Sequence, residues 1–181
     1  DNIWVKCSRK SYVEEIDKRY NKDIEEGKFT ENMVVKGVVT GIDNSKVFVD
    51  IGGDVTAILG VADIAKVFIK HPGEKFNIGD KVDLAIKKLY ANPIKISLSR
   101  AMLLPGWESI DKKFSVGKIV PGIIKGKIPT GVFVELSESF EGLAENLPED
   151  KYYKYGDRVK VCILTMDKKR EKIKLKVIEN K

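Results

Sequence analysis

Two phenylalanines that recur at a fixed spacing are the residues of this chain best suited to contact a ligand. Phe48 lies in the run Val-Phe-Val-Asp-Ile (47–51), and Phe133 lies 85 positions later in the run Val-Phe-Val-Glu-Leu (132–136). If both runs are strands, alternation turns the valines to one side and the phenylalanine to the other, outward side. An outward ring is a flat apolar surface, which either stacks on a flat ligand or is covered by another part of a protein.

The residue types that catalysis needs are not arranged for it. His71 is the only histidine, so a serine or cysteine triad would have to use it, and it precedes Pro72 and Gly73 in what we interpret as a surface turn. The sequence shows no cluster with metal-ligand spacing and no glycine-rich phosphate loop that ends in Lys-Ser or Lys-Thr. We therefore expect a protein that is not an enzyme and that uses neither a metal nor a cofactor.

The composition is that of an ordinary globular protein, with 43% hydrophobic residues among 181. No apolar run approaches the roughly 20 residues of a membrane helix, and no leader indicates secretion. Cys7 and Cys162 lack metal-ligand spacing, so we interpret them as free thiols of a reducing compartment, although the sequence leaves a bridge between them open. We expect a cytoplasmic protein without a membrane partner. The first residue, Asp1, leaves open whether the chain is a piece of a longer one.

Positive charge is concentrated in the second part of the chain. Residues 112–181 hold 16 Lys or Arg against 10 Asp or Glu, whereas residues 1–111 hold 17 of each, so the net charge of +6 belongs to the second part. A basic domain beside a neutral one favours a polyanionic partner for the basic one. The alternative is a lysine-rich surface that is merely solvated.

The two phenylalanines belong to an internal repeat that predicts the architecture. Gly37 and Gly41 return 85 positions later as Gly122 and Gly126, and matches in the second half of each copy recur at a spacing of 77. The first copy therefore carries eight extra residues in its middle, around 66–75. Each copy is preceded by a helix-like segment and has roughly 60–70 residues, a plausible size for a small domain.

Hydrophobic periodicity places five strands in each copy. This order predicts a mainly β protein with two five-stranded OB-fold barrels, each preceded by a short helix. The domains expected from it are a helical segment (1–29), a first barrel (30–100), a linker helix (101–117) and a second barrel (118–181). The expected helices cover 12–26 and 103–114, and the expected strands cover 33–42, 46–51, 56–61, 81–89, 94–98, 118–127, 131–136, 141–145, 158–166 and 172–177.

The motifs in this order resemble those of the S1 RNA-binding domain, and the resemblance covers roughly three quarters of the chain. The second copy carries it through Gly122, Gly126, 131–136, 142–145, 155–161 and 172–175. The first copy carries it through Gly37, 47–51, 78–82 and 96–100. The resemblance implies S1-type barrels that bind single strands by stacking bases on aromatic rings while cations contact phosphates.

The resemblance places the ligand on the face of the second and third strands and on the flanking loops. Phe133 would then be the main stacking platform. The contacts that remain in the first copy are Phe48, Tyr90, Lys87, Lys88 and Lys95. Two features depart from the family pattern in the second copy, because Thr130 replaces an aromatic residue and Glu145 replaces a histidine. The cations expected to contact RNA in the second copy are Lys125, Lys127, Lys168, Lys169, Arg170, Lys172 and Lys174.

Two hypotheses about function follow. The first is a non-catalytic single-stranded RNA-binding protein that acts in translation or RNA handling, with the basic second barrel as the main RNA-binding module. Its candidate partners are mRNA, the ribosome and other RNA-processing proteins. The second hypothesis is a protein-docking adaptor with little RNA contact, and it is motivated by the larger losses in the first copy, where Ser45, Lys46 and Gly60 replace family residues. A mixed arrangement joins the two, with the first barrel docking and the second binding RNA.

Overall fold

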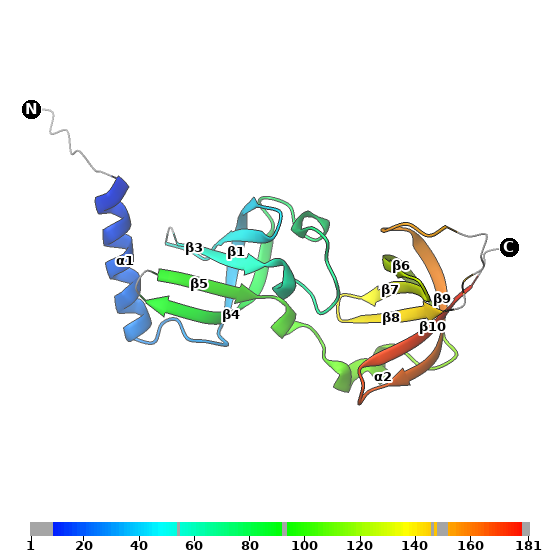
Figure 1. The fold of residues 1–181 in the computed structure, drawn as a ribbon. Helices are drawn as coiled ribbons and strands as arrows, with labels where there is room; N and C mark the ends of the chain where they lie inside the picture. Colours follow the sequence, from blue (N-terminus) through cyan, green and yellow to red (C-terminus); the bar gives the residue numbers. More distant parts are fainter. Residues whose placement is uncertain (1–8, 54, 92–93, 146, 148–151, 179–181) are drawn as a thin grey trace, which may run out of the picture. The chain divides into compact units, whose positions relative to one another are not determined.

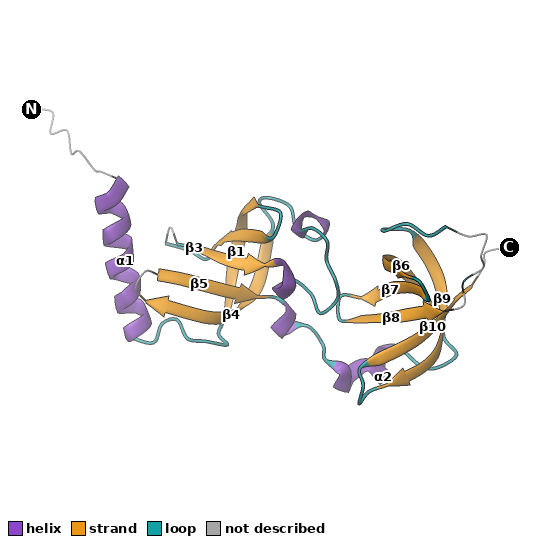
Figure 2. Ribbon diagram, in the orientation of Figure 1, coloured by secondary structure: helices purple, strands orange, loops and turns teal. Residues whose placement is uncertain are grey.

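A computed structural model gives the fold and describes residues 9–53, 55–91, 94–145, 147 and 152–178. The chain forms two compact units, Asp1–Ile64 with Lys70–Leu103 and Ala65–Ile69 with Leu104–Lys181. Strands dominate both units, and helices are few and short apart from the first (Figure 2). Each unit is a closed five-stranded barrel, so the predicted fold class, a mainly β protein with two OB-type barrels, is confirmed.

The first unit starts with one helix, and its barrel strands follow in the order β1-β2-β3-β5-β4 around the barrel. The β3–β5 pair is parallel and the others are antiparallel. Two short 3-10 turns, Val61–Asp63 and Pro72–Glu74, lie between β3 and β4, where the sequence predicts the extra residues. The elements are α1 (Arg9–Glu25), β1 (Val34–Ile42), β2 (Lys46–Asp50), β3 (Thr56–Gly60), β4 (Lys81–Ala91) and β5 (Ile94–Ser99).

Helix α1 is attached to the first barrel through Tyr20. This side chain is buried, its hydroxyl donates to the carbonyl oxygen of Gly52 at 2.6 Å, and its ring stacks on Phe29 with 5.3 Å between centroids. The helix begins three residues before the expected Tyr12 and ends one residue before the expected Glu26. Gly27, with φ of +73°, adopts the left-handed conformation that commonly ends a helix.

The second unit repeats the barrel in the order β10-β8-β7-β6-β9, again with one parallel pair, β8–β10 (Figure 1). A 3-10 turn at Trp107–Ser109 and the short helix α2 (Ile110–Lys113) precede it. Its strands are β6 (Ile119–Ile128), β7 (Gly131–Ser137), β8 (Phe140–Glu145), β9 (Arg158–Asp167) and β10 (Lys172–Ile178).

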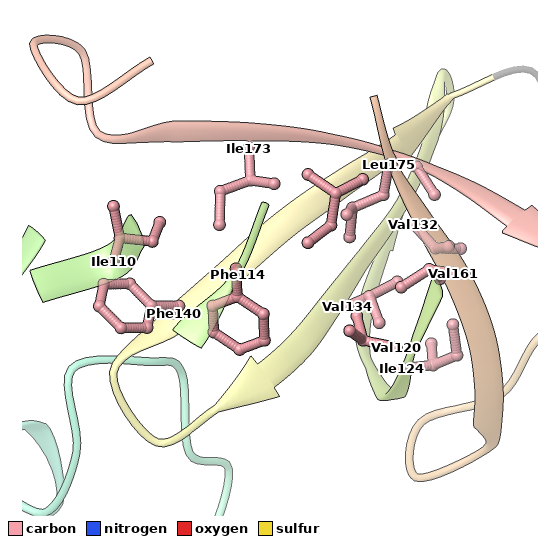
Figure 3. Close-up of a cluster of buried hydrophobic side chains, with 12 residues drawn as sticks. Ile110, Phe114, Val120, Ile124, Val132, Val134, Phe140, Val161, Ile173 and Leu175 are labelled. Carbon is pink, nitrogen blue, oxygen red and sulfur yellow. The ribbon is translucent and has the colours of Figure 1, made fainter. Parts of the chain in front are cut away.

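The core of the second barrel includes residues that precede its first strand. Ile110 of α2 is fully buried, and Phe114 packs edge-on against Phe140 with 5.9 Å between ring centroids (Figure 3). Trp107 also packs edge-on against the Phe140 ring, with 5.4 Å between ring centroids. The segment before β6 therefore closes one end of the barrel core and is more than a connection.

The predicted helix over 103–114 is wrong in its length. The structure has 3-10 turns at Ala101–Leu103 and Trp107–Ser109, and only Ile110–Lys113 is α-helical. The cause is local, because Pro105 disfavours a helical conformation at Leu104, and Gly106 is extended with ψ of 179°.

The recurring glycines mark places where a strand passes close to its neighbour inside each barrel. A Cβ atom on Gly37 would lie 2.3 Å from Cγ1 of Val49, and one on Gly122 would lie 2.3 Å from Cγ1 of Val134. Real carbon atoms do not approach so closely, so a side chain at either position would force the strands apart. The repeat therefore preserves the same close approach in both barrels.

Candidate nucleic-acid interface

A groove of about 540 Å³ lies on the outer face of the second barrel, over β7, β8 and β10. Phe133 of β7 and Leu143 of β8 form its apolar part. Both side chains are half-buried, so part of each surface is open to a ligand. The charged side chains that line it are Glu141, Glu145, Glu171, Lys172 and Lys174.

Strand register explains why these side chains meet. Phe133 pairs with Leu143 across the antiparallel β7–β8 ladder, and Leu143 pairs with Lys174 across the parallel β8–β10 ladder. Residues two positions away on the same strand share a face, which adds the two glutamates of β8 and Lys172 of β10. Strand β7 thus contributes Phe133, and β8 and β10 each contribute a row of side chains.

Space beside the ring of Phe133 is left by a glycine on the neighbouring strand. Gly126 pairs with Phe133, and a Cβ atom there would lie 3.7 Å from the ring. In the first barrel Gly41 pairs with Phe48, and a Cβ atom would lie 3.3 Å from that ring. The second recurring glycine therefore keeps the strand next to each phenylalanine free of a bulky side chain.

The groove is mixed in charge, with two lysines and three glutamates. Lys174 Nζ lies 3.8 Å from Glu145 Oε2, a loose ion pair between side chains that are 63% and 41% exposed. Within the part of the chain that the structure describes, the Oε2 atom of Glu141 is buried and makes no hydrogen bond. The net positive charge of the second barrel therefore lies largely outside this groove.

Lys125 occupies a different place from the one expected of an RNA-contacting cation. Its side chain is 5% exposed, and Nζ lies 3.1 Å from Oε2 of the equally buried Glu135. Nζ also donates to the hydroxyl of Tyr155 at 3.3 Å and lies 5.1 Å from the centroid of that ring. The expectation that Lys125 presents its charge to a ligand does not fit this placement, because Tyr155 covers it.

The other predicted cations of the second barrel are exposed, in four surroundings. Lys172 and Lys174 line the groove, and Nζ of Lys127 lies 5.6 Å from the ring centroid of the exposed Tyr152. Lys168 forms an ion pair with Asp111. Lys169 and Arg170 stand in the turn between β9 and β10.

Asp167 shapes the turn that carries these last two cations. Its Oδ1 atom accepts hydrogen bonds from the backbone N–H groups of Lys169 and Arg170, both at 3.0 Å. A carboxylate that bonds to the backbone two and three residues later is a common way to fix a tight turn. The acidic residue before the last strand thus has a structural role in this barrel.

The first barrel places its predicted residues on the equivalent face. Phe48 is half-buried and pairs with Ile58 of β3, which pairs in turn with Ser97 of β5. Lys95 is exposed two residues before Ser97 and so lies on the same side of β5. Nζ of Lys46 lies 5.3 Å from the centroid of the Phe48 ring.

The two faces differ most in their third strands. Glu141 and Glu145 of β8 pair with Glu135 and Gly131. The equivalent positions on β3 hold Thr56 and Gly60, which pair with Asp50 and Lys46. Of the aligned positions on these two strands, only those of the second barrel carry carboxylates.

Sequence reasoning missed part of the groove. It did not assign Leu143, Glu171 or Glu141 to the binding face. The alternation within 141–145 could have identified the first and third of these, because Leu143, Glu141 and the recognised Glu145 are spaced by two. Glu171 has no such signal, because it lies in the turn before β10.

His71, the only histidine, takes part in a turn as expected. Its Nδ1 atom accepts a hydrogen bond from the N–H of Gly73 at 3.0 Å, and the side chain of Glu74 accepts from the N–H of His71.

Among the described residues there is no group of three or more His, Cys, Asp or Glu side chains placed to hold a metal ion. None of the helices in the described ranges is long and apolar enough to cross a membrane. Cys162 is a free thiol, and Cys7 lies outside the described residues.

Two closed five-stranded barrels, each with a phenylalanine beside a glycine on its outer face, define a tandem OB-type protein. Comparison with known families identifies the kind of OB-type barrel. The model of the S1 RNA binding domain matches residues 28–101 and 113–178, so the chain belongs to this family.

Similar curated proteins are named small ribosomal subunit protein bS1. The protein of Coxiella burnetii is 31% identical over 155 residues, which cover 80% of this chain and 28% of the relative. That of Rhizobium meliloti is 32% identical over 181 residues, which cover 94% of this chain and 32% of the relative. The chain thus spans about a third of the length of these relatives. Among solved structures, GSP13 from Bacillus subtilis matches with a TM-score of 0.40 and 23% identity over 50% of this chain and 74% of that protein.

Proposed function

We propose that this chain is a non-catalytic protein that binds single-stranded RNA, with the second barrel as its main RNA-binding module. Family membership and the ribosomal proteins among its relatives support a role in translation or RNA handling, in the cytoplasm. Candidate partners are mRNA, the ribosome and other RNA-processing proteins. The groove on β7, β8 and β10 is the observation that carries the assignment to the second barrel.

The groove joins the two interactions that a single strand needs. The half-open ring of Phe133 offers a stacking surface for a base, and Lys172 and Lys174 stand at the same groove to contact phosphates. Base–aromatic stacking contributes roughly 1–3 kcal/mol per base. Lys127, Lys169 and Arg170 are exposed on neighbouring parts of the barrel and extend the path for a backbone. One platform with several cations supports binding in about the micromolar range at low salt.

Replacement of Phe133 by alanine is expected to weaken RNA binding by about 1–3 kcal/mol, which is roughly 5- to 150-fold in Kd. The measurement is fluorescence anisotropy of the full chain with a short unstructured RNA at low salt. Phe133→Tyr keeps the ring and should bind like the unchanged protein. Phe48→Ala should have the smaller effect, because Nζ of Lys46 already lies over the Phe48 ring and leaves less of it open to a base.

The two barrels can be told apart by the result. A larger loss from Phe48→Ala than from Phe133→Ala would move the main site to the first barrel. RNA binding that neither substitution changes, or no binding at low salt, would contradict the proposal and favour the docking adaptor.

Binding is expected to weaken steeply with salt, with a log–log slope of about −2 to −3 if three or four phosphates are contacted. The double substitution Lys172→Gln and Lys174→Gln should make this slope shallower by about 1.4, because two phosphate contacts are lost. Lys36→Gln, an exposed lysine of β1, is the control and should leave the slope unchanged. A slope near zero in the unchanged protein would argue against phosphate contacts.

A further inference from the structure

We propose that Glu141 and Glu145 contact the edge of a base stacked on Phe133, and that the second barrel therefore prefers guanine to uracil. The inference rests on the proposed RNA-binding function and adds a base preference to it. It explains why a surface that stacks bases carries carboxylates, which oppose phosphate.

Strand register sets the geometry of this contact. Phe133 pairs with Leu143, so a base on the ring reaches toward the middle of β8. Glu141 and Glu145 are two residues before and after Leu143, and side chains two positions apart share one face of a strand. Both glutamates line the groove with Phe133, one on each side of Leu143.

Both carboxylates have acceptor capacity left for a ligand. The Oε2 atom of Glu141 is buried and accepts no hydrogen bond from the residues that the structure describes. The 3.8 Å between Glu145 Oε2 and Lys174 Nζ is longer than a hydrogen bond. An N–H group of a bound base would bond to Glu145 as it stands, and to the buried oxygen of Glu141 once that carboxylate turns toward the groove, which would give the oxygen the donor that it lacks.

Base chemistry gives the order of preference. An ionised carboxylate only accepts hydrogen bonds, and its two oxygens can accept a parallel pair. Guanine presents two adjacent donors on its pairing edge, the N1–H and the exocyclic amino group. Uracil presents one N–H between two carbonyl oxygens, and these oxygens repel a carboxylate. Guanine should therefore bind more tightly than uracil at this position.

The first barrel is an internal contrast. Thr56 and Gly60 occupy the positions that Glu141 and Glu145 hold in the second barrel. Phe48 is present there, so stacking is possible without a carboxylate on the third strand. No guanine preference of this origin is expected from the first barrel.

The test compares three six-nucleotide RNAs by fluorescence anisotropy with the full chain. One contains only uridine, one has a central guanosine, and one has a central inosine, which keeps N1–H and lacks the amino group. The guanosine RNA is expected to bind roughly fivefold or more tightly than the uridine RNA, and inosine should lose most of this gain. Glu145→Gln should reduce the preference, and the double substitution Glu141→Gln with Glu145→Gln should abolish it.

Each outcome bears on a different claim. If uridine RNA binds and Phe133→Ala weakens it, but guanosine brings no gain, the base preference is overturned while the RNA-binding function stands. A gain that survives both glutamine substitutions also overturns the role of the carboxylates. If none of the RNAs binds, the proposed function fails, and the preference fails with it. Glu31→Gln, an exposed glutamate of the first unit, is the control and should keep the preference of the unchanged protein.

Discussion

Replacing Lys125 with alanine should lower the free energy of unfolding of the second barrel by about 3–5 kcal/mol. The substitution leaves the carboxylate of Glu135, whose side chain is 6% exposed, without the ammonium that lies 3.1 Å away. A buried charge without its partner costs far more than a surface ion pair contributes. Urea unfolding followed by circular dichroism measures the loss.

Two variants separate the charge effect from the loss of packing. Lys125→Met with Glu135→Leu removes both charges and keeps most of the volume, so its stability should stay near that of the unchanged protein. Thr40→Ala changes the residue 85 positions earlier, where the hydroxyl donates only to the carbonyl of Phe48, and should cost about 1 kcal/mol or less. If Lys125→Ala unfolds like the Thr40 variant, Lys125 and Glu135 do not form a buried pair.

This result also decides how binding data for Lys125 are interpreted. Because the ammonium lies under Tyr155, its removal acts on RNA through the stability of the barrel. Affinity measured well below the unfolding temperature should change less for Lys125→Ala than for the Lys172 and Lys174 double variant, whose side chains line the groove.

The barrels themselves were predictable because their pattern is local. Val47 and Val49, like Val132 and Val134, alternate with one outward residue and are completely buried. Alternation with a period of two is a property of neighbouring residues, so it can be seen without knowing what each strand pairs with. Expected and observed strands accordingly differ by only one or two residues at most ends.

The burial of Lys125 was not predictable from such a pattern. It stands at an irregularity of the β6–β7 ladder, between Ile124 and Gly126, where simple alternation no longer assigns a face. Its cover, Tyr155, comes from 30 residues further along the chain. Spacing along one strand carries no information about either effect.

Net charge was a similarly indirect guide. It correctly places the excess of lysine and arginine after residue 111 but does not say which face they occupy. In the structure the groove holds two lysines beside three glutamates, because β8 pairs with β7 and β10. Only the pairing of strands reveals that these charges meet.

Phe140→Ala is expected to destabilise the second barrel by about 3–5 kcal/mol. The side chain is 1% exposed, and it contacts Trp107 and Phe114 edge-on at 5.4 Å and 5.9 Å between ring centroids. Its removal opens a cavity and breaks both aromatic pairs, each of which adds about 0.5–1.5 kcal/mol beyond burial. Hydrogen exchange should show the loss, with faster exchange in β6–β10 than in the unchanged protein.

The comparison with β1–β5 makes this test specific. Those strands form a separate compact unit, so their exchange should stay nearly unchanged in Phe140→Ala. Phe133→Ala is the matched control within the second barrel, because that ring is half-buried and its loss leaves a smaller cavity. Equal destabilisation by both substitutions would contradict a core centred on Phe140. A larger destabilisation by Phe140→Ala than by Phe133→Ala would show that the segment with Trp107, Ile110 and Phe114 belongs to the fold of the second barrel. Its side chains complete the core around Phe140.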